Sequence, residues 1–198
     1  MDSKIITPAN ILTFIRIALV PLYLWLFGLK SFVAVLLALI VFVIAAVTDL
    51  YDGRLARSRK EITRLGKFLD PLADKFLVIG ALVQFWMMGL VNIWLVSIII
   101  VRDIWVTAIR VYAIAGNREL KTSKDAKLKT TIQLTVVITT IVFTGARAAI
   151  IEYIPDYNGV LIEIDRYRLF FNFLLVVAVV FTLYSWFNYI RHNRVVKV

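Results

Sequence analysis

The stretch that decides the fold is residues 32–51, FVAVLLALIVFVIAAVTDLY, an apolar run whose only charge is Asp49. A helix needs about 20 mostly apolar residues to cross the hydrocarbon core of a bilayer. This run has that length, and a second acid, Asp52, follows it directly. Because ionised groups within a membrane are costly, acids at the end of a span seldom lack a function. The stretch therefore predicts a membrane helix that carries part of a functional site.

The composition of the chain is that of an integral membrane protein. Of its 198 residues, 61% are hydrophobic and 18% are charged, and the mean hydropathy is +0.85. Soluble domains average about 45–50% apolar and about 25% charged residues. The net charge of +10 would suggest a nucleic-acid partner in a soluble chain. In a membrane protein it is typical of basic cytoplasmic loops, so we expect no nucleic-acid partner.

The residue types available limit the chemistry. The chain has no cysteine, which excludes disulfides, thiolate metal sites and cysteine nucleophiles. Its single histidine, His192, lies near the C-terminal end. Any catalysis must therefore depend on carboxylates, lysines and arginines.

Six apolar segments are long enough to cross a membrane. We expect them at residues 9–29, 32–51, 66–89, 91–115, 129–150 and 168–190. Residues 28–31 and 88–92 are the expected tight turns, and residues 151–167 form a mixed loop to which we assign no role. No small-residue cleavage site follows the first segment, so we expect that span to be retained. The predicted fold is an all-α bundle of six transmembrane helices in a single domain covering residues 1–198.

The distribution of lysine and arginine predicts the orientation of this bundle. Bases are concentrated after the second span, after the fourth span and in the C-terminal tail: Arg54, Arg57, Arg59, Lys60, Arg64 and Lys67; Arg118, Lys121, Lys124, Lys127 and Lys129; Arg191, Arg194 and Lys197. The positive-inside rule then puts both termini in the cytoplasm, for a protein of the cytoplasmic membrane. A merely solvated basic face would give the same pattern, so these bases bear on topology and not on function.

Four carboxylates flank the connection after the second span. Asp49 and Asp52 are three residues apart, and Asp70 and Asp74 are four apart, so each pair shares one helical face. The connection is short enough for the two faces to meet, and four converging acids would repel unless cations lay between them. Oxygen ligands select hard ions such as Mg²⁺, Mn²⁺ or Ca²⁺. Four carboxylates suit two ions, as in a two-metal clamp on a phosphoryl group. The alternative is that these acids simply pair with the neighbouring arginines.

Small residues beside the acids leave room for a ligand. Gly53 follows Asp52, Ala56 lies one turn further on, and Gly66 lies one turn before Asp70. Such positions allow close approach of a ligand or of another backbone. Arg57 can meet a phosphate with its planar guanidinium group. These features predict a pocket for a diphosphate.

Together these residues resemble the signature of the CDP-alcohol phosphotransferases. The pattern D-x2-D-G-x2-A-R-x8-G-x3-D-x3-D is met in full by Asp49, Asp52, Gly53, Ala56, Arg57, Gly66, Asp70 and Asp74. The resemblance implies a six-helix membrane protein that forms a homodimer and uses two divalent metal ions, Mg²⁺ or Mn²⁺. It implies that an alcohol attacks the β-phosphorus of a CDP-linked donor and that CMP leaves.

The resemblance also implies a role for each position of the motif. Asp49, Asp52 and Asp70 are expected to be the main metal ligands. Asp74 is expected to take the proton from the acceptor hydroxyl and to contact the second metal ion. The CDP site is expected to be lined by Asp52, Gly53, Ala56, Arg57 and Gly66.

Three shorter motifs indicate the acceptor. Residues 8–16 (PANILTFIR), 102–110 (RDIWVTAIR) and 127–133 (KLKTTIQ) resemble segments of the family members that use glycerol 3-phosphate, with Asp103 in place of the usual Glu and Ala126 in place of a common Gly. Bases at cytoplasmic helix ends suit a small dianion. The residues expected to bind the acceptor phosphate are Arg102, Arg110, Lys127 and Lys129. The general excess of lysine and arginine in cytoplasmic loops would explain Lys127 and Lys129 equally well.

The expected function is transfer of the phosphatidyl group from CDP-diacylglycerol to glycerol 3-phosphate. The products would be phosphatidylglycerophosphate and CMP, in phospholipid biosynthesis, at a site that opens on the cytoplasm. Inositol phosphate, serine and phosphatidylglycerol are alternative acceptors for the same chemistry. The sequence leaves open the choice between Mg²⁺ and Mn²⁺, the dimer interface and the preferred acyl chains.

Two other classes of protein explain less of the sequence. A cation transporter would need acids along a path through both leaflets, whereas these acids cluster near one side. A structural membrane protein with a basic lipid-binding surface would explain the lysines and arginines but not the spacing of the aspartates.

Overall fold

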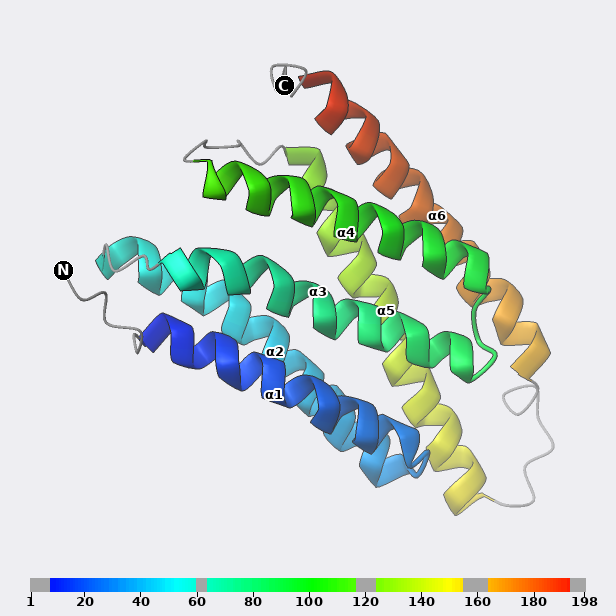
Figure 1. Cartoon of the computed structure of the whole chain (residues 1–198). Helices are drawn as coiled ribbons and strands as arrows, with labels where there is room; N and C mark the ends of the chain where they lie inside the picture. Colours follow the sequence, from blue (N-terminus) through cyan, green and yellow to red (C-terminus); the bar gives the residue numbers. More distant parts are fainter. Residues whose placement is uncertain (1–7, 60–63, 117–123, 155–163, 193–198) are drawn as a thin grey trace. The chain divides into compact units, whose positions relative to one another are not determined.

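The computed structural model describes residues 8–59, 64–116, 124–154 and 164–192. Throughout these ranges the regular elements are helices (Figure 1). They are α1 (Pro8–Gly28), α2 (Phe32–Arg59), α3 (Arg64–Met87), α4 (Ile93–Ala115), α5 (Lys124–Tyr153) and α6 (Ile164–His192). The predicted all-helical fold is confirmed for this part of the chain, and each expected apolar run coincides with a helix of its own.

Three helices are longer than the apolar runs that predicted them. The helix α2 continues eight residues beyond the expected end at residue 51, and α5 and α6 extend at both ends. Hydropathy marks only the apolar part of a helix, whereas arginine, leucine and alanine favour the helical state without being confined to lipid. As a result the whole stretch from Asp49 to Arg57 is helical.

The turn between α3 and α4 lies where residues 88–92 predicted it. The amide of Gly89 donates to the carbonyl of Trp86 at 2.8 Å, and the amide of Leu90 donates to that of Phe85 at 3.0 Å. This pair of bonds is the Schellman pattern, which places a residue with positive φ just after the helix. Gly89 has φ 74°, a conformation that glycine adopts at little cost.

The turn between α1 and α2 is equally short. Lys30 has φ 59°, and the Ser31 hydroxyl accepts a hydrogen bond from the amide of Ala34 at 3.3 Å. This is the geometry of a helix N-cap. A carboxylate oxygen of Glu152 accepts from the amide of Phe32 at 3.0 Å. The start of α2 is therefore held by its own cap and by the C-terminal end of α5.

The chain divides into two compact units, which are described separately. Unit 1 is Met1–Gln84 with Ile141–Tyr157, and unit 2 is Phe85–Thr140 with Asn158–Val198. Unit 1 thus holds α1, α2, most of α3 and the C-terminal half of α5. Unit 2 holds α4, the N-terminal half of α5 and α6.

The core of unit 1 is aromatic where α1 meets α2. The ring of Tyr23 lies 5.7 Å from that of Phe27 and 5.5 Å from that of Phe42, centroid to centroid, and all three side chains are buried. On α3, a Cβ atom added to Gly80 would lie 3.4 Å from the side chain of Leu24. The absence of a side chain at Gly80 therefore lets α3 lie close to α1.

The core of unit 2 follows a seven-residue pattern on α6. Six of its buried residues recur at intervals of four and three: Phe171, Leu175, Ala178, Thr182, Ser185 and Tyr189. This spacing gives one continuous helical face. Its first half is apolar and its second half is polar. The side chain of Asn172, in the first third of α6, accepts a hydrogen bond at 2.7 Å from the amide of Asn92, the residue before α4.

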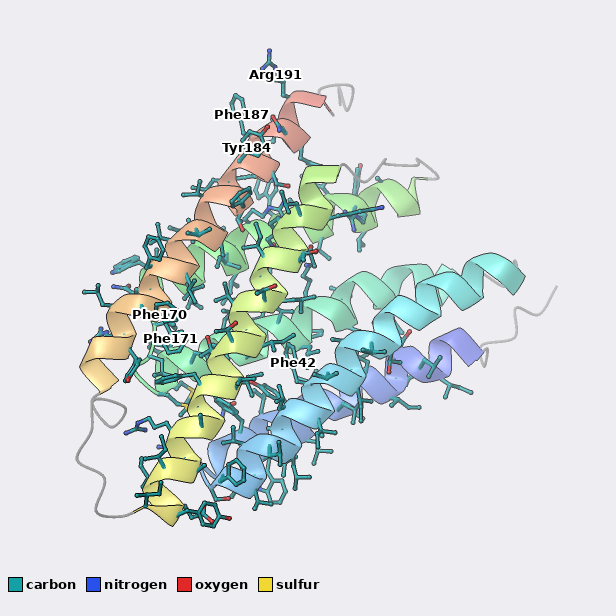
Figure 2. The ribbon with its side chains drawn as sticks, turned by 180° about the vertical axis from the view of Figure 1, so that it is seen from behind. Phe42, Phe170, Phe171, Tyr184, Phe187 and Arg191 are labelled. Carbon is teal, nitrogen blue, oxygen red and sulfur yellow. The ribbon has the colours of Figure 1, made fainter. Side chains whose placement is uncertain are left out.

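Many large apolar side chains are exposed, as expected for a protein surrounded by lipid. On α6, Tyr184 is 56% exposed and Phe187 is 65% exposed, and Figure 2 shows both on the outer side of the helix. By length and composition, the described residues contain three candidate membrane spans: Ile11–Gly28, Lys127–Tyr153 and Tyr167–Arg191. Shorter apolar helical segments cover Phe32–Thr48 and Lys75–Met87. That all six helices cross a membrane, and in which direction, stays a prediction.

Candidate active site

The aspartate motif lies on two consecutive helices of unit 1. Asp49 and Asp52 are on α2, and Asp70 and Asp74 are on α3. Four residues connect Arg59 at the end of α2 to the start of α3, so these two helix ends are at most about 18 Å apart. The neighbouring ends of α2 and α3 lie together in both views (Figures 1 and 2).

The four acids occupy matched heights on the two helices. Asp52 precedes Arg59 by seven residues and Asp70 follows Arg64 by six, while Asp49 and Asp74 are each ten residues from these ends. At 1.5 Å per residue, Asp52 and Asp70 lie about 10 Å along their helices from these ends. Asp49 and Asp74 lie about 15 Å from them. Each helix therefore carries one acid at each of two similar distances from these ends.

The chemistry of this donor set fits divalent metal ions. Carboxylate oxygens are the ligands that Mg²⁺ and Mn²⁺ prefer, and helices fix the spacing within each pair. The side chains of the motif, Asp49, Asp52, Gly53, Ala56, Arg57, Gly66, Asp70 and Asp74, lie outside those that the structure describes. Among the side chains that it does describe, no other group of three or more His, Cys, Asp or Glu residues could hold a metal ion.

Gly53 is placed in the interior of α2, and this position favours a role in binding. Glycine within a helix costs roughly 1 kcal/mol relative to alanine. Gly53 therefore lowers the stability of the helix locally, one residue after the predicted metal ligand Asp52. That loss is explained if a ligand or a backbone approaches the helix closely at this point.

A second polar cluster lies in the core of unit 2. We call Arg102, Asp103 and Lys129 the ionic cluster. The Asp103 Oδ1 atom accepts from the Arg102 guanidinium at 3.1 Å and from the Lys129 ammonium at 2.5 Å. The other terminal nitrogen of Arg102 donates to the Ser185 hydroxyl at 3.0 Å. The carboxylate of Asp103 thus connects α4 to α5, and the guanidinium of Arg102 connects α4 to α6.

The ionic cluster is almost completely buried. Arg102 is 5% exposed, and Asp103 and Lys129 are each 1% exposed. Buried charges are stable only when they are paired and hydrogen-bonded. In this cluster both cations contact the same oxygen of Asp103.

Several buried hydrogen-bonding groups close to this cluster in unit 2 are not used. Among the side chains that the structure describes, Arg102 Nε, Gln133 Nε2 and Tyr189 Oη are buried atoms without a hydrogen-bond partner. The Tyr189 hydroxyl is near enough to the guanidinium groups of Arg102 and Arg110 to interact with both. Leaving such donors unpaired is unfavourable. The region therefore holds three buried donors that no described group uses.

The structure separates the four bases predicted to bind the acceptor phosphate. Arg102 and Lys129 come together in the ionic cluster, and Arg110 is half-buried two turns further along α4. Lys127 is exposed, and residues two apart on a helix do not share a face. The roles of all four bases stay predictions.

Sequence reasoning passed over Ser185 and Tyr189, and it gave no role to Gln133, the last residue of the motif at 127–133. A signal for two of them was present, because Ser185 and Tyr189 are polar residues four apart within an apolar span. Polar side chains at that spacing share one face, and in a membrane helix such a face usually points away from lipid.

The comparison with known families covers most of the chain. Residues 6–184 match the family described as CDP-alcohol phosphatidyltransferase. The chain belongs to this family, which confirms the family predicted from the aspartate motif.

Two of the curated relatives are similar along nearly their whole length, and a third is similar over part of it. A protein of Yersinia enterocolitica named CDP-diacylglycerol–glycerol-3-phosphate 3-phosphatidyltransferase is 34% identical over 186 residues, which is 91% of each chain. A Bacillus subtilis protein of the same name is 33% identical over 196 residues, 93% of each chain. A Mycobacterium tuberculosis protein named probable phosphatidylglycerophosphate synthase is 37% identical over 134 residues. That match spans 66% of this chain and 64% of the relative.

Proposed function

We propose that this protein is a membrane enzyme that transfers the phosphatidyl group from CDP-diacylglycerol to glycerol 3-phosphate. The products are phosphatidylglycerophosphate and CMP, in phospholipid biosynthesis. The observation that carries the proposal is the similarity along 91% and 93% of two relatives that are named for this reaction. The complete aspartate motif on α2 and α3 supports the same reaction class.

In the proposed reaction, the acceptor hydroxyl oxygen attacks the β-phosphorus of the donor. The bond from that phosphorus to the bridging oxygen of the diphosphate breaks, and CMP leaves with the oxygen. The carboxylate of Asp74 accepts the hydroxyl proton as general base. Positioning of the two substrates and electrostatic stabilisation provide most of the catalysis.

The donor would be held by the residues of the aspartate motif. Asp49, Asp52 and Asp70 would bind two divalent ions, with Asp74 as a further ligand. When bound, such ions neutralise the diphosphate and stabilise the charge that develops on the leaving CMP. The CDP group would lie against Asp52, Gly53, Ala56, Arg57 and Gly66.

The acceptor phosphate would bind to the four predicted bases, Arg102, Arg110, Lys127 and Lys129. Arg102 and Lys129 supply charge from the ionic cluster, and Arg110 adds a third base near Tyr189. Lys127, which is exposed, would attract the dianion at longer range. The four bases and the unused donors favour a phosphorylated acceptor over serine.

The proposed setting is the cytoplasmic membrane, with the chain as one catalytic domain and as a homodimer. All six helices would cross the bilayer, with both termini and the active site facing the cytoplasm. The exposed apolar side chains and the three long apolar helices support a lipid environment.

The proposal is tested by assaying the purified full-length protein in detergent. CDP-diacylglycerol is supplied with radiolabelled glycerol 3-phosphate, and lipid product and CMP are measured with Mg²⁺, with Mn²⁺ and with a chelator. We expect product and CMP in equal amounts with either ion and neither with the chelator. Parallel reactions contain inositol phosphate, serine or phosphatidylglycerol. Failure to convert glycerol 3-phosphate, or faster conversion of another acceptor, would refute the assignment.

A further inference from the structure

We propose that the C-terminal end of α6 binds an anionic phospholipid of the surrounding bilayer. The surface that binds it, here called the α6 lipid site, consists of Tyr184, Phe187 and Arg191. This inference rests on the proposed membrane setting but not on the proposed reaction, so the two can fail separately. The bound lipid is a component of the membrane and need not be a substrate.

The three residues share one exposed face of α6. Tyr184 is 56% exposed and Phe187 is 65% exposed, and Arg191 is also exposed. Their spacing of three and four residues places them on the same side of the helix. Figure 2 shows the three side chains following one another toward the C-terminal end of α6. Two aromatic rings therefore lead along the helix to one guanidinium group.

The length of the candidate span sets the depth of this surface in a bilayer. The span Tyr167–Arg191 has 25 residues, which at 1.5 Å per residue measure about 37 Å. The hydrocarbon core is about 30 Å thick, and the bilayer with its headgroups about 40–45 Å. Both ends of the span therefore reach the headgroup layers. Tyr184 lies about 10 Å before Arg191, so the rings can contact acyl chains while the guanidinium contacts a headgroup.

The charge of this segment favours an anionic headgroup. Residues 166–198 contain no aspartate and no glutamate, so this stretch of the chain supplies no carboxylate for Arg191. A guanidinium group forms strong, paired hydrogen bonds with phosphate oxygens. The choline of a zwitterionic lipid compensates the charge of its own phosphate, whereas an anionic lipid keeps a net negative charge. The α6 lipid site therefore complements an anionic phospholipid in both charge and apolar surface.

The opposite end of α6 carries an arginine without this arrangement. Arg168 is exposed, but the residues three and seven positions further on, Phe171 and Leu175, are buried. Its face of the helix thus leads into the core and not along exposed rings. Arg168 is the matched control for Arg191, because both are exposed arginines at an end of the same helix.

Fluorescence quenching by lipids tests the inference on the full-length protein in vesicles. The chain has no cysteine, so Val180→Cys gives a single labelling position. Val180 is 58% exposed and lies one turn before Tyr184 on the same face. The fluorophore is quenched by acyl-brominated phosphatidylglycerol or by acyl-brominated phosphatidylcholine, in vesicles that otherwise consist of phosphatidylcholine. We expect an apparent affinity about fivefold higher for the anionic lipid, the usual effect of one base near a membrane surface.

Three further variants, each made in the labelled Val180→Cys protein, separate lipid binding from simple anchoring of the helix end. Arg191→Gln should reduce the preference to about one, whereas Arg191→Lys should keep at least about threefold because it retains the charge. Arg168→Gln should leave the preference at about fivefold. Salt at about 1 M, where the Debye length is about 3 Å, should weaken the preference without any substitution. An arginine that only anchors the helix would give no dependence on lipid charge.

The outcomes separate the inference from the proposed function. Equal quenching by the two lipids, an unchanged preference in Arg191→Gln, or an equal loss in Arg168→Gln would overturn the α6 lipid site. If Arg191→Gln does not fold, Arg191→Lys and the salt dependence decide: the inference requires the preference to persist in the first and to weaken with salt. A protein that prefers the anionic lipid but forms no phosphatidyl product refutes the proposed function alone.

Discussion

At the scale of the residue, the motif aspartates differ in what they are expected to do. Asp49, Asp52 and Asp70 would bind metal ions, whereas Asp74 would also take a proton. Loss of a general base typically reduces the rate by about 10²–10⁴-fold. The same loss need not affect folding, because asparagine preserves the size of the side chain.

Asp74→Asn should therefore lower CMP release by at least about 10²-fold. The measurement is CMP formed per minute by purified protein, with the unfolding temperature recorded for each variant. Glu152→Gln is the matched control, because Glu152 is an acid of unit 1 that caps α2 and lies outside the motif. Normal CMP release by D74N would exclude Asp74 as the base.

Tyr189 offers a second test at this scale. Its buried hydroxyl has no hydrogen-bond partner among the described groups, so removing it should not destabilise the fold. If the hydroxyl donates to the acceptor, Tyr189→Phe should raise the KM for glycerol 3-phosphate by about two- to tenfold, the worth of one hydrogen bond. Steady-state kinetics and thermal unfolding together check this. An unchanged KM would remove Tyr189 from the site.

At the scale of the element, the packing of α3 on α1 determines the positions of Asp70 and Asp74 on α3. The side chain of Gln84 on α3 donates to the carbonyl of Leu24 on α1 at 3.1 Å, and Gly80 lies against the side chain of that same residue. Both contacts are on the half of α3 that follows the motif. A change there can move the motif without altering any of its residues.

Gly80→Leu should separate α3 from α1, because a Cβ atom at this position already lies 3.4 Å from Leu24. Overpacking of this kind costs about 1–3 kcal/mol. We expect both a lower unfolding temperature and lower transferase activity. Gly80→Ala is the control, since alanine adds only an ordinary contact and favours the helix by up to about 1 kcal/mol. Full activity in Gly80→Leu would show that α3 does not need this close approach.

The positions of the helices were predictable from the sequence, whereas the ionic cluster was not. Apolar runs identified all six helices, and the turn at Gly89 followed from a glycine between two spans. The aspartate motif was recognisable because its spacing is local. The pairing of Asp103 with Lys129 depends on how α4, α5 and α6 pack, which no local pattern encodes. For the same reason, sequence could not distinguish buried Lys129 from exposed Lys127.

At the scale of the whole molecule, the orientation in the membrane decides which substrates can reach the site. A lipid donor enters from the bilayer, whereas glycerol 3-phosphate is charged and soluble. The basic segments favour a cytoplasmic site. The absence of cysteine from all 198 residues allows the orientation to be measured directly, since any introduced cysteine is the only thiol in the chain.

Single cysteines at exposed positions near the helix ends should report six crossings. With a membrane-impermeant maleimide on intact cells, we expect labelling at Leu29, Trp94 and Ile154, each replaced by Cys. Cysteines in place of Gly116 and Arg191 should react only after the membrane is permeabilised, because both positions adjoin basic segments that the positive-inside rule puts in the cytoplasm. Each variant is first checked for transferase activity. Labelling of the Gly116 or Arg191 variant in intact cells would reverse the orientation. Protection of the Leu29, Trp94 or Ile154 variant would mean that the helix ends at that position do not reach the outer surface.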